Sequence, residues 1–331
     1  MMAGHARQSK SAAHPEREGH NRSMRIVRIA APTVVAFALA LVWSGVLAVR
    51  SLDGLPVSPF ATLVLVPVLR LVMFMSGAVA LGGTIVGTLL DTVDAARRIA
   101  QRSAVVFAAA SAMLAVATLA DVLATEWWNA LDSRMLLSFL TQIDEGRYLV
   151  LQVILGGAAA VLLGRVAHRT DAAFVAVLLA IAVALPGFTG HSAAQTTHWF
   201  ASLTMIVHLL AMSVWVGGVV ALLASRAFHL ARLFSPIALA AYTLLMLSGI
   251  ASLGARVGDW NALLHDRYLV VLLGKVLVYL AIGVIAYRMR AHMFVPDTPP
   301  ASLVRRMLAV EVALMGVALA FAVTLARMPN P

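Results

Sequence analysis

FASLTMIVHLLAMSVWVGGVVALLA, residues 200–224, identifies the solvent in which this chain folds. The stretch contains no Lys, Arg, Asp or Glu, and its one readily ionisable side chain is His208. A helix needs about 20 predominantly apolar residues to cross the hydrocarbon core of a bilayer. We therefore predict that residues 200–224 form a transmembrane helix.

Comparable apolar stretches recur along the whole chain. We expect spans near 29–49, 66–90, 103–123, 148–165, 172–188, 200–224, 236–254, 268–287 and 304–326. The chain is 61% hydrophobic and 12% charged, with a mean hydropathy of +0.91, whereas a soluble domain carries about a quarter charged residues. The predicted fold class is all-α, a polytopic membrane helix bundle of about nine transmembrane helices.

Short basic segments separate the apolar stretches and alternate along the chain. Arginines follow the second, fourth, sixth and eighth expected spans: Arg97, Arg98, Arg102, Arg165, Arg169, Arg226, Arg232, Arg288, Arg290, Arg305 and Arg306. The segment 187–199, between the fifth and sixth spans, has no Lys or Arg. Because cytoplasmic loops are enriched in these residues, we expect a cytoplasmic N-terminus and a C-terminus outside. The net charge of +10 then needs no nucleic-acid partner.

Two motifs occur twice in the same order, which indicates an internal duplication. WNAL stands at 128–131 and 260–263, and RYLV stands at 147–150 and 267–270. We expect two parallel four-helix repeats, related by an axis along the membrane normal. The expected organisation is a disordered basic cytoplasmic tail at 1–27, an extra first helix and loop at 28–57, and the two repeats at 58–189 and 190–331. Residues 132–141 are expected to form an interfacial helix with Leu136, Leu137 and Leu140 toward lipid.

The two repeats differ in their ionisable residues. His208 has Arg70 as its approximate counterpart, whereas Lys275 and Glu311 fall opposite leucines. Ionisable side chains within a membrane are costly and commonly mark a pathway or a ligand site. We therefore predict that the second repeat carries the function.

One stripe of the 200–224 helix gathers imidazole and thioether groups. At about 100° per residue, four side chains lie within roughly 60° of His208: Thr204, Met205, Met212 and Trp215. His198 lies near the edge of this sector, about 15 Å nearer the outer surface, and His191 precedes it in the loop. Imidazole suits copper and zinc, and thioether selects reduced copper. Because the chain has no cysteine, we predict a copper path with His191, His198, His208, Met205 and Met212 as metal ligands.

Each of these residues also has an ordinary explanation. Methionine pairs on a helix commonly pack, and Gly217 and Gly218 are expected to allow close helix packing. Lys275 shares a helix face with Tyr268 and Tyr279, and Glu311 shares one with Met307 and Met315. Lys275 and Glu311 either form a structural ion pair or act separately, with Glu311 attracting a cation or a proton. Arg70 is expected to reach the outer surface by snorkelling.

The sequence resembles the copper resistance protein D family. The resemblance rests on HLLAMSVWVGG at 208–218 and on the Gly190-His191 loop, with further support from Ser235-Pro236, Ser248-Gly249 and the step from Tyr268 to Lys275. It covers roughly residues 60–326. It implies a bacterial inner-membrane protein linked to copper uptake or tolerance, in which His191, His198, His208 and Trp215 matter. Some relatives carry a soluble copper-binding domain; without one, a separate periplasmic copper-binding protein is the implied partner.

The expected function is inward transport of copper, as Cu+ or Cu2+, across the bacterial cytoplasmic membrane. The sequence has no Gly-rich phosphate loop, so we expect no ATP-driven transport and no enzyme activity. Two alternatives remain open. One is a membrane b-type cytochrome with haem held through His208, and the other is a copper-delivery factor for oxidase assembly without net transport.

Overall fold

All regular secondary structure in the described part of the chain is helical. The computed structural model describes residues 31–44, 57–90, 94–189, 198–257, 260–293 and 300–328. Eight helices are long and apolar enough to cross a membrane: α2 (Phe60–Thr84), α3 (Asp94–Val122), α5 (Asp144–Leu163), α6 (Arg169–Ala184), α7 (His198–Ser225), α8 (Ala231–Arg256), α10 (Arg267–Met293) and α11 (Ala301–Leu325). The first predicted span is represented by the shorter apolar helix Ala31–Trp43. The predicted all-α, polytopic membrane bundle is confirmed.

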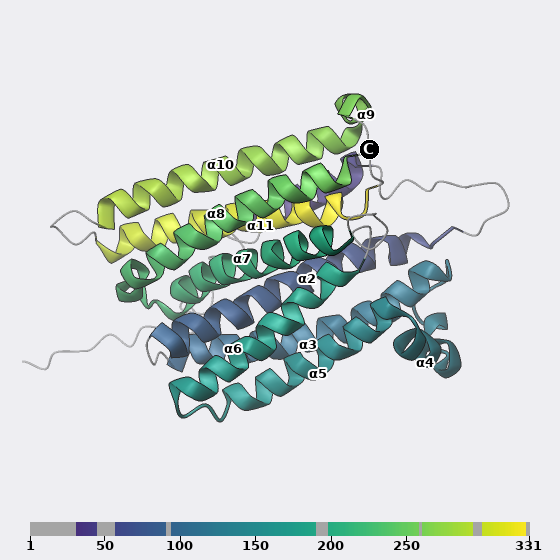
Figure 1. Cartoon of the computed structure of the whole chain (residues 1–331), viewed down its shortest axis with the longest axis horizontal. Helices are drawn as coiled ribbons and strands as arrows, with labels where there is room; N and C mark the ends of the chain where they lie inside the picture. Colours follow the sequence, from purple (N-terminus) through teal and green to yellow (C-terminus); the bar gives the residue numbers. More distant parts are fainter. Residues whose placement is uncertain are drawn as a thin grey trace, which may run out of the picture.

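Helices α2 and α7 pack closely at the centre of the bundle (Figure 1). A Cβ atom added at Gly217 would overlap the backbone carbonyl of Ala78 in α2, and one added at Gly82 would overlap the backbone of Gly217. Gly218 in turn faces the ring of Phe234 in α8. Within a membrane, such small residues let helix backbones approach and gain dispersion contacts. The interpretation of Gly217 and Gly218 as packing residues is confirmed.

The two halves of the chain follow a similar packing order. In the first half α2 packs along α3, α3 along α5 and α5 along α6, and in the second half α7 packs along α8 and α10 along α11. The repeated WNAL motif forms a short helix in each half, at Asn129–Leu131 and at Trp260–His265 (α9). The halves differ at one interface, because α3 packs extensively on α5 whereas α8 meets α10 at few described positions.

The loosely packed pair is also the pair most exposed to lipid. In the apolar segments of α8 and α10, 17% and 11% of the residues are buried, compared with 56% in α3 and 61% in α7. The remaining apolar side chains of α8 and α10 face outward, where the hydrocarbon of a bilayer solvates them. The most buried spans are α2, α3, α7 and α11.

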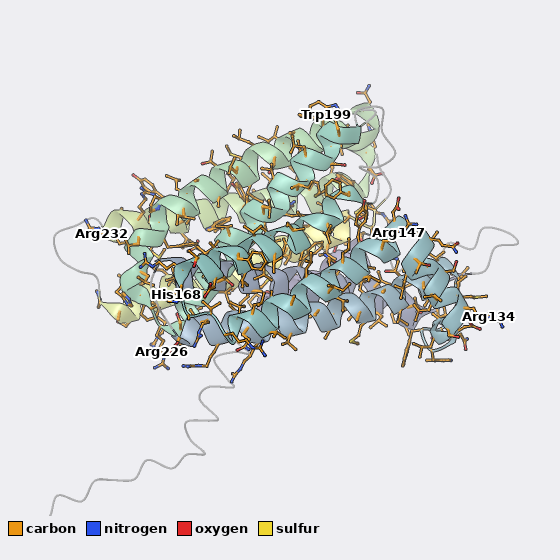
Figure 2. All side chains as sticks on the ribbon, turned by 60° about the horizontal axis from the view of Figure 1, so that its bottom comes forward. Arg134, Arg147, His168, Trp199, Arg226 and Arg232 are labelled. Atoms are coloured by element: carbon orange, nitrogen blue, oxygen red, sulfur yellow. The ribbon has the colours of Figure 1, made fainter. Side chains whose placement is uncertain are left out.

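Charged side chains gather at the two ends of the bundle. Figure 2 shows His168, Arg226 and Arg232 at one end and Arg134, Arg147 and Trp199 at the other. We call these the Arg226 end and the Trp199 end. The basic segments that follow the fourth and sixth predicted spans thus lie at the same end, as the alternation of the loops predicts.

The predicted interfacial segment is the helix α4 (Ser133–Gln142) at the Trp199 end. Leu137 is exposed as predicted, but Leu136 and Leu140 pack against the hydrophobic core. Phe139 on the same helix is buried in that core. The prediction that all three leucines face lipid is wrong for two of them, because α4 packs on α5 and α3 and presents one face to them.

Candidate functional site

His208 lies within α7, ten residues after its first residue, and its ring rests against α8. The Nδ1 atom is 3.1 Å from the hydroxyl oxygen of Ser248. The ring atom Cε1 is 3.5 Å from the position that a Cβ atom would take at Gly249. The Ser248-Gly249 pair of α8 therefore lies against one edge of the imidazole.

The hydrogen bonds of Ser248 favour one of the two neutral tautomers of His208. The Ser248 hydroxyl donates to the carbonyl oxygen of Leu244 at 2.6 Å, and a hydroxyl has one proton to donate. Its oxygen must then accept the hydrogen bond from Nδ1–H of His208. In a neutral imidazole the lone pair is consequently on Nε2, which is the nitrogen that a metal ion would bind.

The predicted stripe of α7 faces other helices. Thr204 is buried, and its hydroxyl oxygen accepts a hydrogen bond from Ser252 of α8 at 3.4 Å. Met212 is buried and Met205 is half-buried, and both pack in the hydrophobic cluster that contains Trp215. Thr204, Met212 and Trp215 therefore lie in the protein interior, whereas His208 and Met205 are half-buried. Coordination of copper by the two methionines stays a prediction.

The outer part of the predicted copper path consists of His191 and His198. His191 lies outside the described residues, as does the side chain of His198, the first residue of α7. Across the described segments, no three His, Asp or Glu side chains are close enough to share a metal ion. A copper site at His208 would therefore use thioether ligands or residues outside the described part of the chain.

Trp215, Tyr242, Tyr279 and Glu311 form a layer to which α7, α8, α10 and α11 each contribute one residue. The Trp215 ring meets Tyr242 edge-on at a centroid distance of 5.1 Å and Tyr279 at 6.3 Å. The two tyrosine rings stack at 4.4 Å, and the Tyr279 hydroxyl donates to the Tyr242 carbonyl at 2.6 Å. The Trp215 side chain lies beside the Glu311 carboxylate. We call these four residues the aromatic layer.

The aromatic layer lies on the Arg226 side of His208. Trp215 is seven residues further along α7, which corresponds to about 10 Å along the helix axis. Lys275 is four residues from Tyr279 toward the Trp199 end, and Ser248 is six residues from Tyr242 in the same direction. These offsets of about 6 and 9 Å bring Lys275 near the level of His208.

Glu311 and Lys275 are the two residues for which the sequence left an ion pair open. Gly274, the neighbour of Lys275, packs against the ring of Phe321, which is ten residues beyond Glu311 and about 15 Å further along α11. None of the ion pairs among the described residues includes Glu311. The two residues therefore lie at different depths, which favours separate roles for Lys275 and Glu311 over a structural ion pair.

Tyr268, which the sequence grouped with Lys275, has a packing role. Its ring is 4% exposed and belongs to a small hydrophobic cluster with Leu325 and Met328 at the Trp199 end. Its backbone N–H donates to the Asp266 carboxylate at 2.7 Å and so helps to begin α10. Tyr268 lies almost two turns from the level of Lys275, about 10 Å away along α10.

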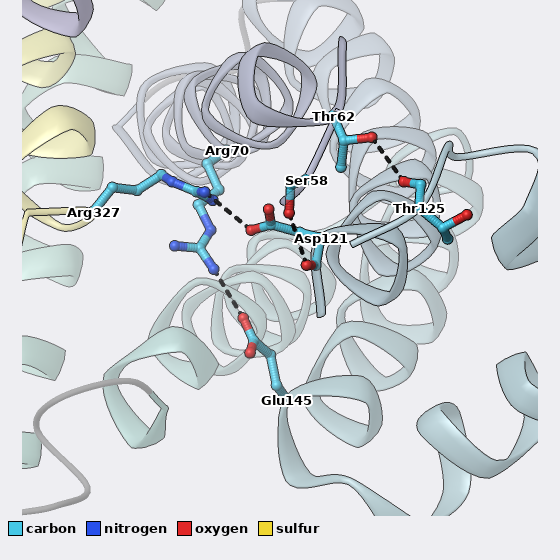
Figure 3. A network of polar contacts seen from close by, with 7 residues as sticks. All are labelled: Ser58, Thr62, Arg70, Asp121, Thr125, Glu145 and Arg327. Carbon is cyan, nitrogen blue, oxygen red and sulfur yellow. Dashed lines mark hydrogen bonds and ion pairs between the residues drawn. The ribbon is translucent and has the colours of Figure 1, made fainter. Parts of the chain in front are cut away.

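Arg70 belongs to a charge cluster at the Trp199 end (Figure 3). Its Nη2 donates to Glu145 Oε1 at 2.9 Å, and Arg327 Nη2 donates to Asp121 Oδ2 at 3.0 Å. The second pair links the residues after α11 to the last turn of α3, and so joins the two halves of the chain. The Arg70 and Glu145 side chains are 25% and 37% exposed, so the position of Arg70 is compatible with the expected snorkelling, with a carboxylate as its partner.

Sequence reasoning overlooked Tyr242, Asp121 and Arg327. Tyr242 gave no local signal, because its partners Trp215 and Tyr279 are distant in the sequence. Asp121 did give a signal: it is an acidic residue near the end of an otherwise apolar span, where a charge commonly has a partner.

Two family models match the chain. Residues 59–200 match the model described as copper resistance protein D-like, N-terminal domain, and residues 228–325 match the model described as copper resistance protein D. The first range includes α2 to α6, and the second includes most of α8 to α11. Most of α7, with the segment 208–218, lies between the two ranges. No curated protein and no solved structure matched the chain.

Proposed function

The chain belongs to the copper resistance protein D family, and from this premise we propose that it moves copper ions through the bacterial cytoplasmic membrane. Family membership implies a role in copper resistance, and eight spanning helices make the chain a multi-pass membrane protein. Copper is the cargo in this proposal. We propose in addition the direction of copper movement, the membrane that the protein crosses and the side chains that bind the ion.

The arrangement of His208 is the observation that supports the proposal most strongly. An imidazole within a membrane span is costly unless it has a polar partner or a function. Ser248 supplies the partner and directs Nε2 away from the hydrogen bond, as the supporting residues of metal-binding histidines do. Met205 and Met212 on the same stripe provide thioethers, which bind Cu+ in preference to harder ions.

We propose that the Arg226 end faces the cytoplasm, as the arginines there favour. A periplasmic copper-binding protein would deliver copper to His191 and His198 near the Trp199 end. The ion would then pass to His208 and the two methionines before continuing toward the cytoplasm. Movement would be inward and driven by the membrane potential or by coupling to another ion.

Metal analysis of purified protein tests the copper site. His208→Ala should lower the amount of Cu+ bound per chain, because it removes the imidazole ligand from the span. His265→Ala is the matched control, since His265 is exposed in α9 at the Trp199 end. If His208→Ala and the control retain the same copper content as the unaltered protein, then His208 is not a copper ligand.

Sealed vesicles distinguish transport from the alternatives. A transporter accumulates copper inside vesicles, whereas a delivery factor for oxidase assembly binds copper without accumulating it. An absorption spectrum of the same purified protein tests for haem, because a b-type cytochrome shows an intense Soret band. Accumulation that His208→Ala abolishes, without a Soret band, is the result expected.

A further inference from the structure

We infer that the aromatic layer contains a second cation site, in which Glu311 binds reduced copper after it leaves His208. This inference rests on the proposed function, because it assumes that copper reaches the interior of the bundle. The second site differs from the site at His208 in the residue that binds the ion, in the helix that carries this residue and in its depth in the bundle. Glu311 belongs to α11, whereas the stripe around His208 belongs to α7.

The first observation is that the Glu311 carboxylate is incompletely satisfied. Glu311 is 1% exposed, and its Oε2 atom has no hydrogen-bond partner among the described residues. Trp215 is a neighbouring side chain of this carboxylate. An ionised carboxylate away from water is strongly unfavourable unless a positive charge lies beside it. None of the ion pairs among the described residues includes Glu311, so the layer offers a place for a mobile cation.

The surroundings of Glu311 favour a soft, singly charged cation. One carboxylate neutralises one positive charge, and a divalent ion would leave a net charge in an apolar environment. Met315 lies one turn from Glu311 on the same helix face and is 2% exposed. Met315, Met212 and Trp215 belong to one hydrophobic cluster. Thioethers prefer Cu+, and an indole ring attracts a cation through its π face.

The position of Glu311 fits a step that follows His208. The aromatic layer is about 10 Å closer to the Arg226 end than His208, and α7 packs against α11. An ion bound first by a neutral imidazole would then meet a carboxylate of opposite charge. The tyrosines of the layer link α8 to α10 beside it, so that a change in the layer would alter the contact between these two helices.

Binding of Ag+, which resembles Cu+ in charge and softness and does not change oxidation state, tests the second site. Equilibrium dialysis of the full chain in detergent should show one Ag+ fewer per chain in Glu311→Gln than in the unaltered protein. Glu145→Gln is the matched control, because Glu145 pairs with Arg70 at the Trp199 end and should leave the Ag+ content unchanged. Met315→Leu conserves the volume but removes the thioether, so it should weaken Ag+ binding at this site.

The combination of variants separates the second site from the first. If Glu311→Gln binds as much Ag+ as the unaltered protein while His208→Ala binds less, the inference fails and the proposed function stands. If His208→Ala binds as much while Glu311→Gln binds less, the second site stands and the proposed role of His208 fails. If excess Na+ displaces Ag+ from His208→Ala as readily as Cu+ does, Glu311 is not a soft-metal site and the inference is overturned.

Discussion

Replacing Ser248 by alanine tests whether the hydrogen bond to His208 prepares the ring for copper. The Ser248 oxygen accepts from Nδ1–H at 3.1 Å and thereby assigns the lone pair of a neutral ring to Nε2. In Ser248→Ala the ring loses this acceptor while Gly249 still leaves room for it. The ring then rotates more freely, and the proton exchanges between its two nitrogens.

The size of the effect follows from the single bond that is lost. A hydrogen bond between partly buried neutral groups contributes about 1 kcal/mol, and removing a residue that orients a metal ligand lowers affinity roughly 10- to 100-fold. We expect the lower end for Ser248→Ala, about a 10-fold weaker Cu+ affinity, which corresponds to about 1.4 kcal/mol. The lost bond from Ser248 to the Leu244 carbonyl adds little, because that carbonyl already belongs to the helix.

A competition titration with a chromophoric Cu+ chelator measures this difference. Ser252→Ala is the matched control, because Ser252 is one turn further along α8 and contacts Thr204 instead of His208. The control should bind Cu+ as the unaltered protein does. Equal affinities for Ser248→Ala and Ser252→Ala would refute the argument that Ser248 positions the copper ligand.

Two further predictions concern the bundle itself. Gly217→Ala should destabilise the protein by about 1–3 kcal/mol, because its Cβ atom would overlap α2. Gly157→Ala is the control, because a Cβ atom there meets open space, and it should be neutral or stabilise the protein by up to about 1 kcal/mol. Thermal unfolding in detergent compares the two variants, and equal unfolding midpoints would contradict the close contact between α2 and α7. A double-mutant cycle on Arg327→Ala and Asp121→Ala should give a coupling of about 1 kcal/mol, because the pair is 14% and 23% exposed. Additive effects of these two changes would show that the pair does not hold the halves together.

The fold was predictable because the membrane restricts the choices. Where no water is present, a backbone satisfies its hydrogen bonds within a helix, so an apolar stretch such as 200–224 reports both its structure and its length. The repeated motifs at 128–131 and 260–263 likewise indicated two related halves. The side toward which Leu136 and Leu140 of α4 turn was not predictable, because a short amphipathic helix can pack on protein or on lipid with the same apolar face.

The candidate site was predictable in part for a similar reason. The stripe on α7 follows from helix geometry, and most of its residues are buried. Pairing between helices does not follow from a single sequence, since it depends on how far each helix is shifted along its neighbour. Lys275 and Glu311 lie on adjacent helices but at different depths, and the sequence could not separate an ion pair from two independent charges. The contact between His208 and Ser248 also depends on how far α8 is shifted along α7, so the sequence alone did not predict it.

The contrast between the two halves explains where a pathway can form. In the first half the ring of Phe107 packs against Gly77 and Gly156, so that three helices close around one aromatic side chain. The corresponding second-half interface between α8 and α10 has its aromatic contact at Tyr242 and Tyr279, on the Arg226 side of His208. The polar side chains of His208 in α7 and Ser248 in α8 lie on the Trp199 side of this contact. The first half is thus closely packed at this interface, whereas His208 and Glu311 lie at successive depths beside the looser interface of α8 and α10.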